Sequence, residues 1–408
     1  MSIFPRLRAR GRGVISHPLF ILALAALFVA VLASSLQAQG SLTPPGTPAP
    51  TMKTLDQVEA RKIVNAANTP GDAANTFIIS APGSYYLVTN LAGESGKNGI
   101  SIQADDVTLD LNGFAIISGG GSAARGVNVP VAKTSICIRN GSVRGWSGGG
   151  VRGDAATGVA EKLRLAGNVG AIGLAMGNGS IIRDCESSGN GIGFFAPDRT
   201  IVSNCIATVN TGIGISGTDY VNVIDSTASR NGGVGIQLGG SNTVTRCSVT
   251  RNDGGGIAEG GGSQIADCAV GTNTGHGISL GAGSAVRNCT ANANTQKGIV
   301  ATERCQLIGN TCEANQTGID VTGAGNRVDG NHCNAIAANT VGFHIGGSQN
   351  IVVRNTARGP IRQISPGVFV VDTAYVFDNS ANNSYGPILG SASGQITSNS
   401  PWANFQNF

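Results

Sequence analysis

The sequence predicts an all-β protein built as a parallel β-solenoid, and three observations support this fold class. The 408-residue chain holds 62 Gly, with only 5% aromatic and 12% charged residues, a composition that disfavours a helical bundle. Residues 138–357 repeat with a period near 21. Apolar residues alternate with polar ones inside each repeat, as on strands with one buried side. Units this short bury their apolar faces only by stacking on their neighbours.

Two columns of small or amide side chains, five residues apart, mark the period. The first column holds Cys185, Cys205, Ser226, Cys247, Cys268, Cys289, Asn310, Asn331 and Asn355, with steps of 20 or 21 residues before a last step of 24. The second column holds Asn168, Asn190, Asn210, Asn231, Asn252, Asn273, Asn294 and Asn315. Asparagine tolerates the left-handed backbone region, and its amide can bond to the units above and below. We therefore expect these asparagines at a turn.

Each unit contains at least two short strands. The residue two positions after each first-column residue is small or apolar, which marks the buried side of one strand. A second strand is marked by Gly-Ile pairs such as Gly214–Ile215 and Gly235–Ile236. Glycine is expected at the other turns of the unit, because those turns need positive φ.

The N-terminal region predicts export. Four arginines, the last at Arg12, precede an apolar run over 19–33, so residues 1–38 are expected to be a signal peptide cleaved near Ala38. The alternative is an uncleaved membrane anchor, because 19–36 is at the lower limit for crossing a bilayer. Residues 39–52 form a Pro-rich linker. No membrane partner is expected once the signal is cleaved.

The remaining chain divides into a helical cap, a solenoid and a C-terminal cap. Residues 53–76 are expected to form an N-terminal α-helical cap, because a capping-box start at Thr54 precedes apolar residues on one helical face, among them Leu55, Ile63 and Ala66. The parallel β-helix is expected over 77–360. Residues 361–408 are expected to form C-terminal strands and a cap, with Trp402 closing the last rung.

The charge balance argues against a nucleic-acid partner. Four of the 27 basic residues lie in the first dozen positions, so residues 39–408 carry 23 positive and 23 negative side chains. A neutral chain lacks the electrostatic attraction that nucleic-acid binding needs.

The asparagine column, the Gly-Ile strands and the segment 107–113, Val-Thr-Leu-Asp-Leu-Asn-Gly, resemble the right-handed parallel β-helix superfamily typified by pectate lyases and polygalacturonases. The resemblance extends to secreted bacterial β-helix proteins. It implies a right-handed, single-stranded β-helix of ten to twelve rungs in the periplasm, at the cell surface or in the medium of a bacterium. It also implies a polysaccharide or cell-surface glycan as partner.

One segment resembles a catalytic motif of the superfamily. Gly275-His276-Gly277 is similar to the Gly-His-Gly segment of polygalacturonases, which makes His276 a candidate catalytic residue. The alternative is that His276 occupies a variable position of the repeat, because glycosidic hydrolysis needs two positioned carboxylates and none are found beside it.

Asp198 and Asp219 are the second pair of candidates, for catalysis or for metal binding. They are 21 residues apart and are expected to stack, where two carboxylates share a proton or bind a cation such as calcium. Calcium is the one cofactor that the sequence suggests. The alternative is two solvated turn residues.

Three further patterns carry structural expectations. Lys162, Asp184, Asn204, Asp225, Arg246, Asp267 and Asn288 alternate in charge and are expected to form a surface ion-pair ladder. The nine cysteines are expected to be stacked and buried rather than bridged, with Cys312 and Cys333 as the pair best placed for a disulfide. Serines and threonines such as Thr208, Thr227 and Ser229 are expected to form an outward hydroxyl array.

Two functions follow from these patterns. The first is a non-catalytic scaffold that binds polysaccharide or a surface. The alternative, which the resemblance implies, is a polysaccharide lyase or glycoside hydrolase acting on acidic glycans.

Overall fold

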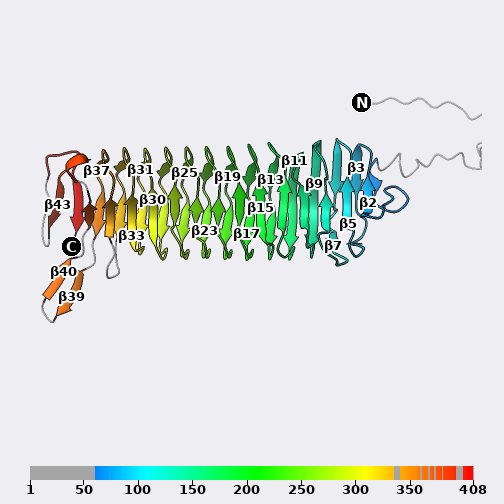
Figure 1. Cartoon of the computed structure of the whole chain (residues 1–408), viewed down its shortest axis with the longest axis horizontal. Coiled ribbons are helices and arrows are strands. Elements are labelled where there is room, and N and C mark those ends of the chain that lie inside the picture. Colours follow the sequence, from blue (N-terminus) through cyan, green and yellow to red (C-terminus); the bar gives the residue numbers. More distant parts are fainter. Residues whose placement is uncertain are drawn as a thin grey trace, which may run out of the picture. The chain divides into compact units, whose positions relative to one another are not determined.

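The computed structural model of the chain describes residues 60–334, 341–358, 361–365, 368–371, 374–378, 380–391 and 398–407. The chain divides into a unit of residues 1–59 and a unit of residues 60–408. The second unit is a stack of parallel strands (Figure 1). The predicted signal peptide and linker lie outside the described residues. Within the described part, no helix has the length and apolar character needed to cross a membrane.

Sheet B forms one wall of the stack. It contains fourteen parallel strands, one for each rung. They are β2 (Asn75–Ile79), β5 (Asn98–Ile102), β8 (Arg125–Asn128), β10 (Gly149–Gly153), β12 (Ile172–Met176), β15 (Ile192–Ala196), β18 (Ile215–Gly217), β21 (Ile236–Gln237), β24 (Ile257–Ala258), β27 (Ile278–Leu280), β30 (Lys297–Ala301), β33 (Thr317–Val321), β36 (Val341–Ile345) and β41 (Tyr375–Phe377).

Sheet A is bent and forms the rest of the wall, with 28 strands in parallel pairing. In the N-terminal rungs they are β1 (Lys62–Ile63), β3 (Gly83–Tyr86), β4 (Leu91–Ala92), β6 (Val107–Asp110), β7 (Ala115–Ile117), β9 (Lys133–Arg144) and β11 (Ala156–Ala166). In the regular rungs they are β13 (Ile181–Arg183), β14 (Glu186–Ser188), β16 (Ile201–Ser203), β17 (Ile206–Thr208), β19 (Asn222–Ile224), β20 (Thr227–Ser229), β22 (Thr243–Thr245), β23 (Ser248–Thr250), β25 (Gln264–Ala266), β26 (Ala269–Gly271), β28 (Ala285–Arg287), β29 (Thr290–Asn292), β31 (Gln306–Ile308), β32 (Thr311–Glu313), β34 (Arg327–Asp329), β35 (His332–Asn334), β37 (Ile351–Val353) and β38 (Thr356–Arg358). The C-terminal strands are β42 (Ser384–Tyr385), β43 (Ile388–Ser391) and β44 (Asn404–Asn407).

The predicted all-β parallel solenoid is confirmed, and it is longer than the predicted ten to twelve rungs. Regular rungs advance by 21 residues, as in the pairing of Phe194 with Ile215. The first rungs advance by more, for example from Ile100 to Val127, because their turns are longer. A search at a period of 21 therefore misses them.

The N-terminal cap differs from the prediction in its described part. Residues 53–59 of the predicted cap lie outside the described residues, and the chain from residue 60 onward forms β1 and a turn instead of a helix. The Asn65 side-chain oxygen accepts hydrogen bonds from the backbone N–H of Ala67 (3.0 Å) and Asn68 (2.8 Å). A side chain that satisfies these donors favours a turn over a helix.

The described strands of the C-terminal region extend both sheets. Strand β41 pairs with β36 of sheet B, and β44 pairs with β38 of sheet A. An antiparallel hairpin of β39 (Ile361–Ser365) and β40 (Val368–Val371) lies outside the stack (Figure 1), and a 3-10 turn, η1 (Ser380–Asn382), precedes β42.

The predicted asparagine column forms a buried ladder between sheet A and sheet B. The Asn231 side-chain N–H donates to the side-chain oxygen of Asn252 (2.9 Å) and to the carbonyl of Ala207 (3.1 Å). The Asn231 backbone N–H donates to the same Asn252 oxygen at 3.1 Å. Each asparagine side chain thus satisfies polar groups of the rungs before and after it, which a buried corner requires.

The backbone role assigned to these asparagines is corrected. The left-handed residue at this corner precedes the asparagine, as at Val209 (φ 55°) and Arg230 (φ 54°). A second left-handed residue bends sheet A between its two strands in each rung, as at Asn204 (φ 52°) and Asp225 (φ 51°). Asparagine therefore recurs at this position because its side chain forms the hydrogen bonds of the ladder, and not because the backbone there needs a left-handed φ.

The glycines before the sheet B strands are explained by space rather than by positive φ. A Cβ on Gly256 would lie 2.3 Å from the carbonyl oxygen of Gly277 and 3.0 Å from the side-chain nitrogen of Asn273. Gly256 and the equivalent Gly214 do not have positive φ. The asparagine ladder therefore requires a residue without a side chain at the start of the facing strand.

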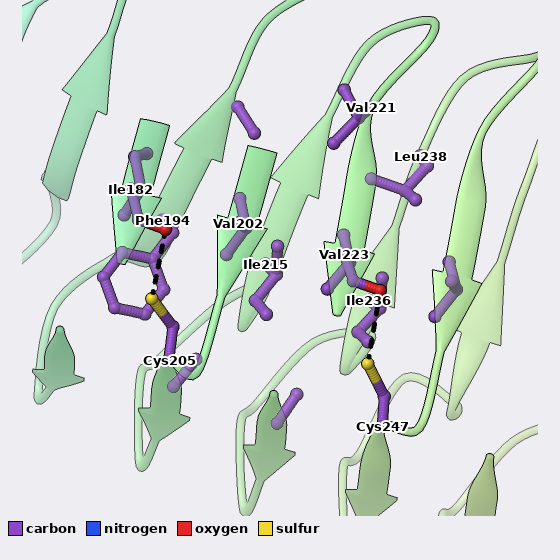
Figure 2. Packing of buried hydrophobic residues seen from close by; sticks show 14 of the residues in the cluster. Ile182, Phe194, Val202, Cys205, Ile215, Val221, Val223, Ile236, Leu238 and Cys247 are labelled. Carbon is purple, nitrogen blue, oxygen red and sulfur yellow. Dashed lines mark hydrogen bonds between the residues drawn. The ribbon is translucent and has the colours of Figure 1, made fainter. Parts of the chain in front are cut away.

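The core is a set of stacked columns, and the cysteines form part of its lining. Ile215 and Ile236 of sheet B face Val202 and Val223 of sheet A, and the Cys205 thiol donates to the carbonyl of Ile182 at 3.6 Å (Figure 2). Small, weakly polar side chains fit this corner because they fill space and satisfy one acceptor. All nine cysteines are free, and eight are buried.

Native thiols are expected to resist alkylation except at Cys137. Cys137 is the one cysteine that is only partly buried, and burial raises the pKa of its thiol, which slows its reaction. Counting alkylated thiols by mass spectrometry should give at most one per native chain and nine in denaturant without reductant. Fewer than nine in denaturant would show a disulfide and contradict the free state of the cysteines.

Candidate functional site

A charged cluster lies on the outer face of sheet B near the C-terminal end of the stack. Alternation along β33 and β36 points Ile319 and Phe343 into the core and Asp320 and His344 outward. Asp320 and His344 are paired in register on these neighbouring strands. Lys297 at the start of β30 and Asp378 after β41 complete the group. We call Lys297, Asp320, His344 and Asp378 the Asp320 cluster.

The cluster is organised around a buried carboxylate. The Asp320 side chain is 1% exposed, and it accepts a hydrogen bond from the Lys297 ammonium group and contacts His344 Nδ1 at 2.6 Å. His344 Nε2 lies 3.1 Å from an oxygen of Asp378, whose side chain is 57% exposed. A buried carboxylate is tolerated only where it is paired in this way. Asp320 therefore fixes the positions of a lysine and a histidine at the surface.

The two carboxylates favour the protonated form of His344. Burial lowers the pKa of His344, but the hydrogen bonds and charges of Asp320 and Asp378 outweigh burial and raise the pKa above its ordinary value of 6.5. In the protonated ring both nitrogens donate, Nδ1 to Asp320 and Nε2 to Asp378. Nε2 is then the proton-bearing atom at the accessible side of the cluster.

The stabilisation that His344 provides is expected to disappear as the pH rises. Its folded-state pKa lies above 6.5, so its contribution is complete below that value and is lost as the pH rises through the folded-state pKa. Thermal unfolding of the wild type and of His344→Gln from about pH 5.5 to about pH 8.5 measures this. The difference between their midpoints should shrink toward high pH, and a constant difference would contradict the assignment.

His276, the histidine predicted as catalytic, lies one rung before Lys297. The backbone N–H of Lys297 donates to His276 Nδ1 at 3.4 Å. Burial and the nearby Lys297 charge lower the pKa of His276, although Asp320 acts in the opposite direction. A neutral ring that accepts at Nδ1 carries its proton on Nε2. His276 thus offers a neutral N–H donor beside the Asp320 cluster.

Asp198 and Asp219 lie at the opposite edge of sheet B from His276. They follow β15 and β18, whereas His276 precedes β27. Asp198 accepts hydrogen bonds from the Thr218 hydroxyl group and from the backbone N–H of Asp219 (3.3 Å), and Asp219 accepts from the N–H of Gly240 at 2.6 Å. The pKa of Asp198 is lowered, chiefly by the Thr218 hydrogen bond. Both side chains therefore stabilise turns, and the structure does not bring them to His276.

The described part of the chain holds no cluster of side chains that could bind a metal ion. No group of three or more His, Cys, Asp or Glu side chains there is arranged to hold a metal ion. Calcium at Asp198 and Asp219 stays a prediction.

The predicted ion-pair ladder runs along the bend of sheet A. Arg246 contacts Asp225 at 2.7 Å, and the side-chain amide of Asn204 donates to Asp184 at 2.6 Å. In the N-terminal rungs the bend holds a polar hollow of about 300 Å³. Its lining includes Asn140, Ser142, Lys162, Arg164, Asp184 and Glu186. Oppositely charged side chains neutralise one another there, so the hollow has no preference for one sign of ligand.

The predicted hydroxyl array lies on the outer face of sheet A. Thr208, Thr227 and Ser229 are half-buried and alternate with buried alanines. The Thr208 and Ser229 hydroxyl groups are 3.3 Å apart and hydrogen-bonded. The array is therefore regular, but its hydroxyl groups are partly satisfied by one another.

Sequence reasoning missed the Asp320 cluster, although a usable signal was present. The first column contains a step of 24 residues, from Asn331 to Asn355. The same step leads from Asp320 to His344 and would have placed them side by side. Asp378 could not be found by counting, because the β39–β40 hairpin separates it from the preceding sheet B strand.

The comparisons with known proteins agree with this architecture. Residues 178–312 and 211–358 match the family model described as a right-handed beta helix region. No curated protein sequence matches the chain. The A-module of the mannuronan C-5 epimerase AlgE6 from Azotobacter vinelandii is similar in structure, with a TM-score of 0.58 and 17% identity over 67% of this chain and 90% of that chain.

Two other solved structures show weaker similarity. The periplasmic alginate epimerase AlgG has a TM-score of 0.38 and 14% identity, covering 84% of this chain and 80% of that chain. Pectate lyase Pel9A has a TM-score of 0.33 and 12% identity, covering 69% of this chain and 70% of that chain. At these identities the similarity concerns the backbone and not the site. What the family model and the AlgE6 A-module show for this chain is the fold, a right-handed parallel β-helix.

Proposed function

We propose that the protein is an exported enzyme that acts on an acidic polysaccharide, with the Asp320 cluster as its catalytic site. The observation that carries the proposal is the buried Asp320 carboxylate, which holds Lys297 and His344 at the surface of sheet B. Buried, paired titratable groups cluster at functional sites, and the partners of Asp320 include a histidine, a side chain suited to proton transfer. The similar fold of a mannuronan C-5 epimerase supports a glycan as substrate.

The cluster suits proton transfer next to a carboxylate better than hydrolysis. Glycoside hydrolysis needs two carboxylates that both reach the sugar. Asp320 is 1% exposed and occupied by Lys297 and His344, so Asp378 is the accessible carboxylate of the cluster. In the proposed reaction, Lys297 pairs with the uronate carboxylate, which makes the adjacent carbon more acidic, and the exposed Asp378 carboxylate removes the proton from that carbon. A C=C double bond forms as the glycosidic C–O bond on the next ring carbon breaks, and protonated His344 gives its Nε2 proton to the leaving oxygen. This is lyase-type chemistry.

The test is a reaction in heavy water with polyuronates and neutral polysaccharides, with and without a calcium chelator. Unsaturated products, or deuterium at the carbon next to the carboxylate, would support proton abstraction, and neutral polysaccharides should not react. Binding to polyuronates without either product would contradict catalysis. Unchanged activity after chelation would contradict a role in the reaction for the predicted calcium at Asp198 and Asp219.

A non-catalytic scaffold is the second candidate function, favoured by the hydroxyl array. Substituting Thr227 and Ser229 with alanine is then expected to weaken adsorption to the glycan without changing the unfolding transition. Adsorption that is insensitive to these substitutions would contradict it.

A further inference from the structure

A second cluster of charged side chains lies on sheet A, on the same two rungs as Asp320 and His344. Asp329 on β34 is buried, with 3% of its side chain exposed. Arg327, on the same strand, reaches it at 2.7 Å, and Arg354, at the bend after β37, contacts it through Nε at 2.7 Å. Trp402 precedes β44, and the guanidinium carbon of Arg354 lies 5.6 Å from its ring centroid. We call these four residues the Trp402 site.

The charges at the Trp402 site do not balance. One carboxylate faces two guanidinium groups, so the group carries one surplus positive charge. In the middle of the stack the pairing along this bend is one to one, as for Arg246 and Asp225. At its N-terminal end Asp110 also contacts two arginines, Arg139 at 3.2 Å and Arg61 at 3.8 Å. The Arg327 and Arg354 side chains remain 43% and 51% exposed, so their unused N–H donors face solvent. Such forked donors match the two oxygens of a carboxylate.

The tryptophan adds a flat apolar surface beside these donors. Trp402 was expected to close the last rung, yet it is 50% exposed, whereas Trp146 is fully buried in the core. Its backbone carbonyl accepts from the Arg354 N–H at 3.4 Å, which ties its position to the arginine. An exposed indole of this size is a stacking surface for a ring with an apolar face.

The surface next to the arginines is free of bulky side chains at the bend. On the two preceding rungs the bend positions are Gly309 and Gly330. A Cβ added to Gly330 would have no atom within 4 Å. A ligand can therefore approach Arg327 and Arg354 along the bend without meeting a side chain at Gly330.

We propose that the Trp402 site binds an acidic sugar unit, whose ring stacks on Trp402 and whose carboxylate pairs with Arg354 and Arg327. A uronate is the chemical class that combines an apolar ring face with a carboxylate. The site is non-catalytic, because its four residues include no histidine or lysine for proton transfer and its carboxylate is held by two arginines. It shares with the proposed function only the class of ligand, and its residues are separate from the Asp320 cluster.

Tryptophan fluorescence provides a direct test, because the chain has two tryptophans and Trp146 is fully buried. Titration of the protein with uronate oligosaccharides should change the emission of Trp402, and neutral oligosaccharides should not. The affinity should fall with added salt. Arg354→Gln and Trp402→Ala, measured by calorimetry, should each weaken binding about tenfold or more, in line with the loss of a charged or aromatic contact. Arg354→Lys should lie between wild type and Arg354→Gln, because it keeps the charge without the fork.

The chain offers matched controls for both side chains. Arg246→Gln removes an arginine from the same bend, and Tyr220→Ala removes an aromatic ring that is 55% exposed and 5.8 Å from Arg199. Neither should change binding. His344→Gln should abolish the proposed reaction while leaving this binding intact, so the two proposals fail separately. Wild-type affinity in both Arg354→Gln and Trp402→Ala, or no binding of uronates by folded wild type, would overturn the proposal.

Discussion

Replacing Asn252 with alanine is expected to destabilise the middle of the solenoid by about 3–5 kcal/mol, since several buried polar groups lose their partners at about 1–3 kcal/mol each. The Asn252 side-chain oxygen accepts from the backbone and side-chain N–H groups of Asn231. Its side-chain nitrogen donates to the carbonyl of Ala228 and to the side-chain oxygen of Asn273. Alanine satisfies none of these groups.

Denaturant unfolding measures the effect, and hydrogen exchange locates it. The lost protection should be concentrated at Asn231 and the neighbouring rungs, because each rung of a solenoid contacts mainly its neighbours. The control is Asn222→Ala on the outer face of β19, where the side chain is only half-buried. Equal losses in the two variants would show that the ladder has no special role in stability.

Replacing Asp320 with asparagine is expected to lower the proposed activity on the order of 100-fold, a typical contribution of a positioned acid or base. The variant keeps the shape of the side chain but removes the charge that holds Lys297 and His344. The pKa of His344 should fall, because Asp320 is a main cause of its increase. Activity that needs protonated His344 would then be lost at a lower pH than in the wild type.

The pH–rate profile separates this role from a loss of folding. A merely structural role for Asp320 would lower activity at every pH without moving the alkaline limb of the profile. Asp225→Asn is the matched control, because this aspartate pairs with Arg246 on the outside of sheet A, away from the cluster. Full activity of Asp320→Asn, or loss of activity in Asp225→Asn, would contradict the assignment.

The repeat made the fold predictable, because every regular rung repeats the same environment. Asn231 and Asn252 recur where a buried corner needs an amide, and the valines recur where the wall faces the core. The backbone role of the column was not predictable, because recurrence does not distinguish a hydrogen-bonding constraint from a φ constraint. The structure assigns the left-handed φ to Val209, whose residue type gives no hint of it.

The candidate site was harder to predict, because it consists of exceptions to the repeat. His276 was found from a short motif, and the structure places it beside Lys297. Asp320 and His344 were not predicted to be neighbours, because a three-residue insertion makes their separation 24 residues instead of 21. Asp198 and Asp219 were found because they keep the period, and their hydrogen bonds to the next rung explain why.

The aligned side chains of the asparagine ladder also give the solenoid a dipole along its axis. In every step from Asn190 to Asn294, the side-chain nitrogen points to the next rung and the oxygen to the previous one. Aligned amide dipoles add, as peptide dipoles do along an α-helix. The column is therefore polarised along the axis of the stack, with its positive end toward the C-terminal rungs.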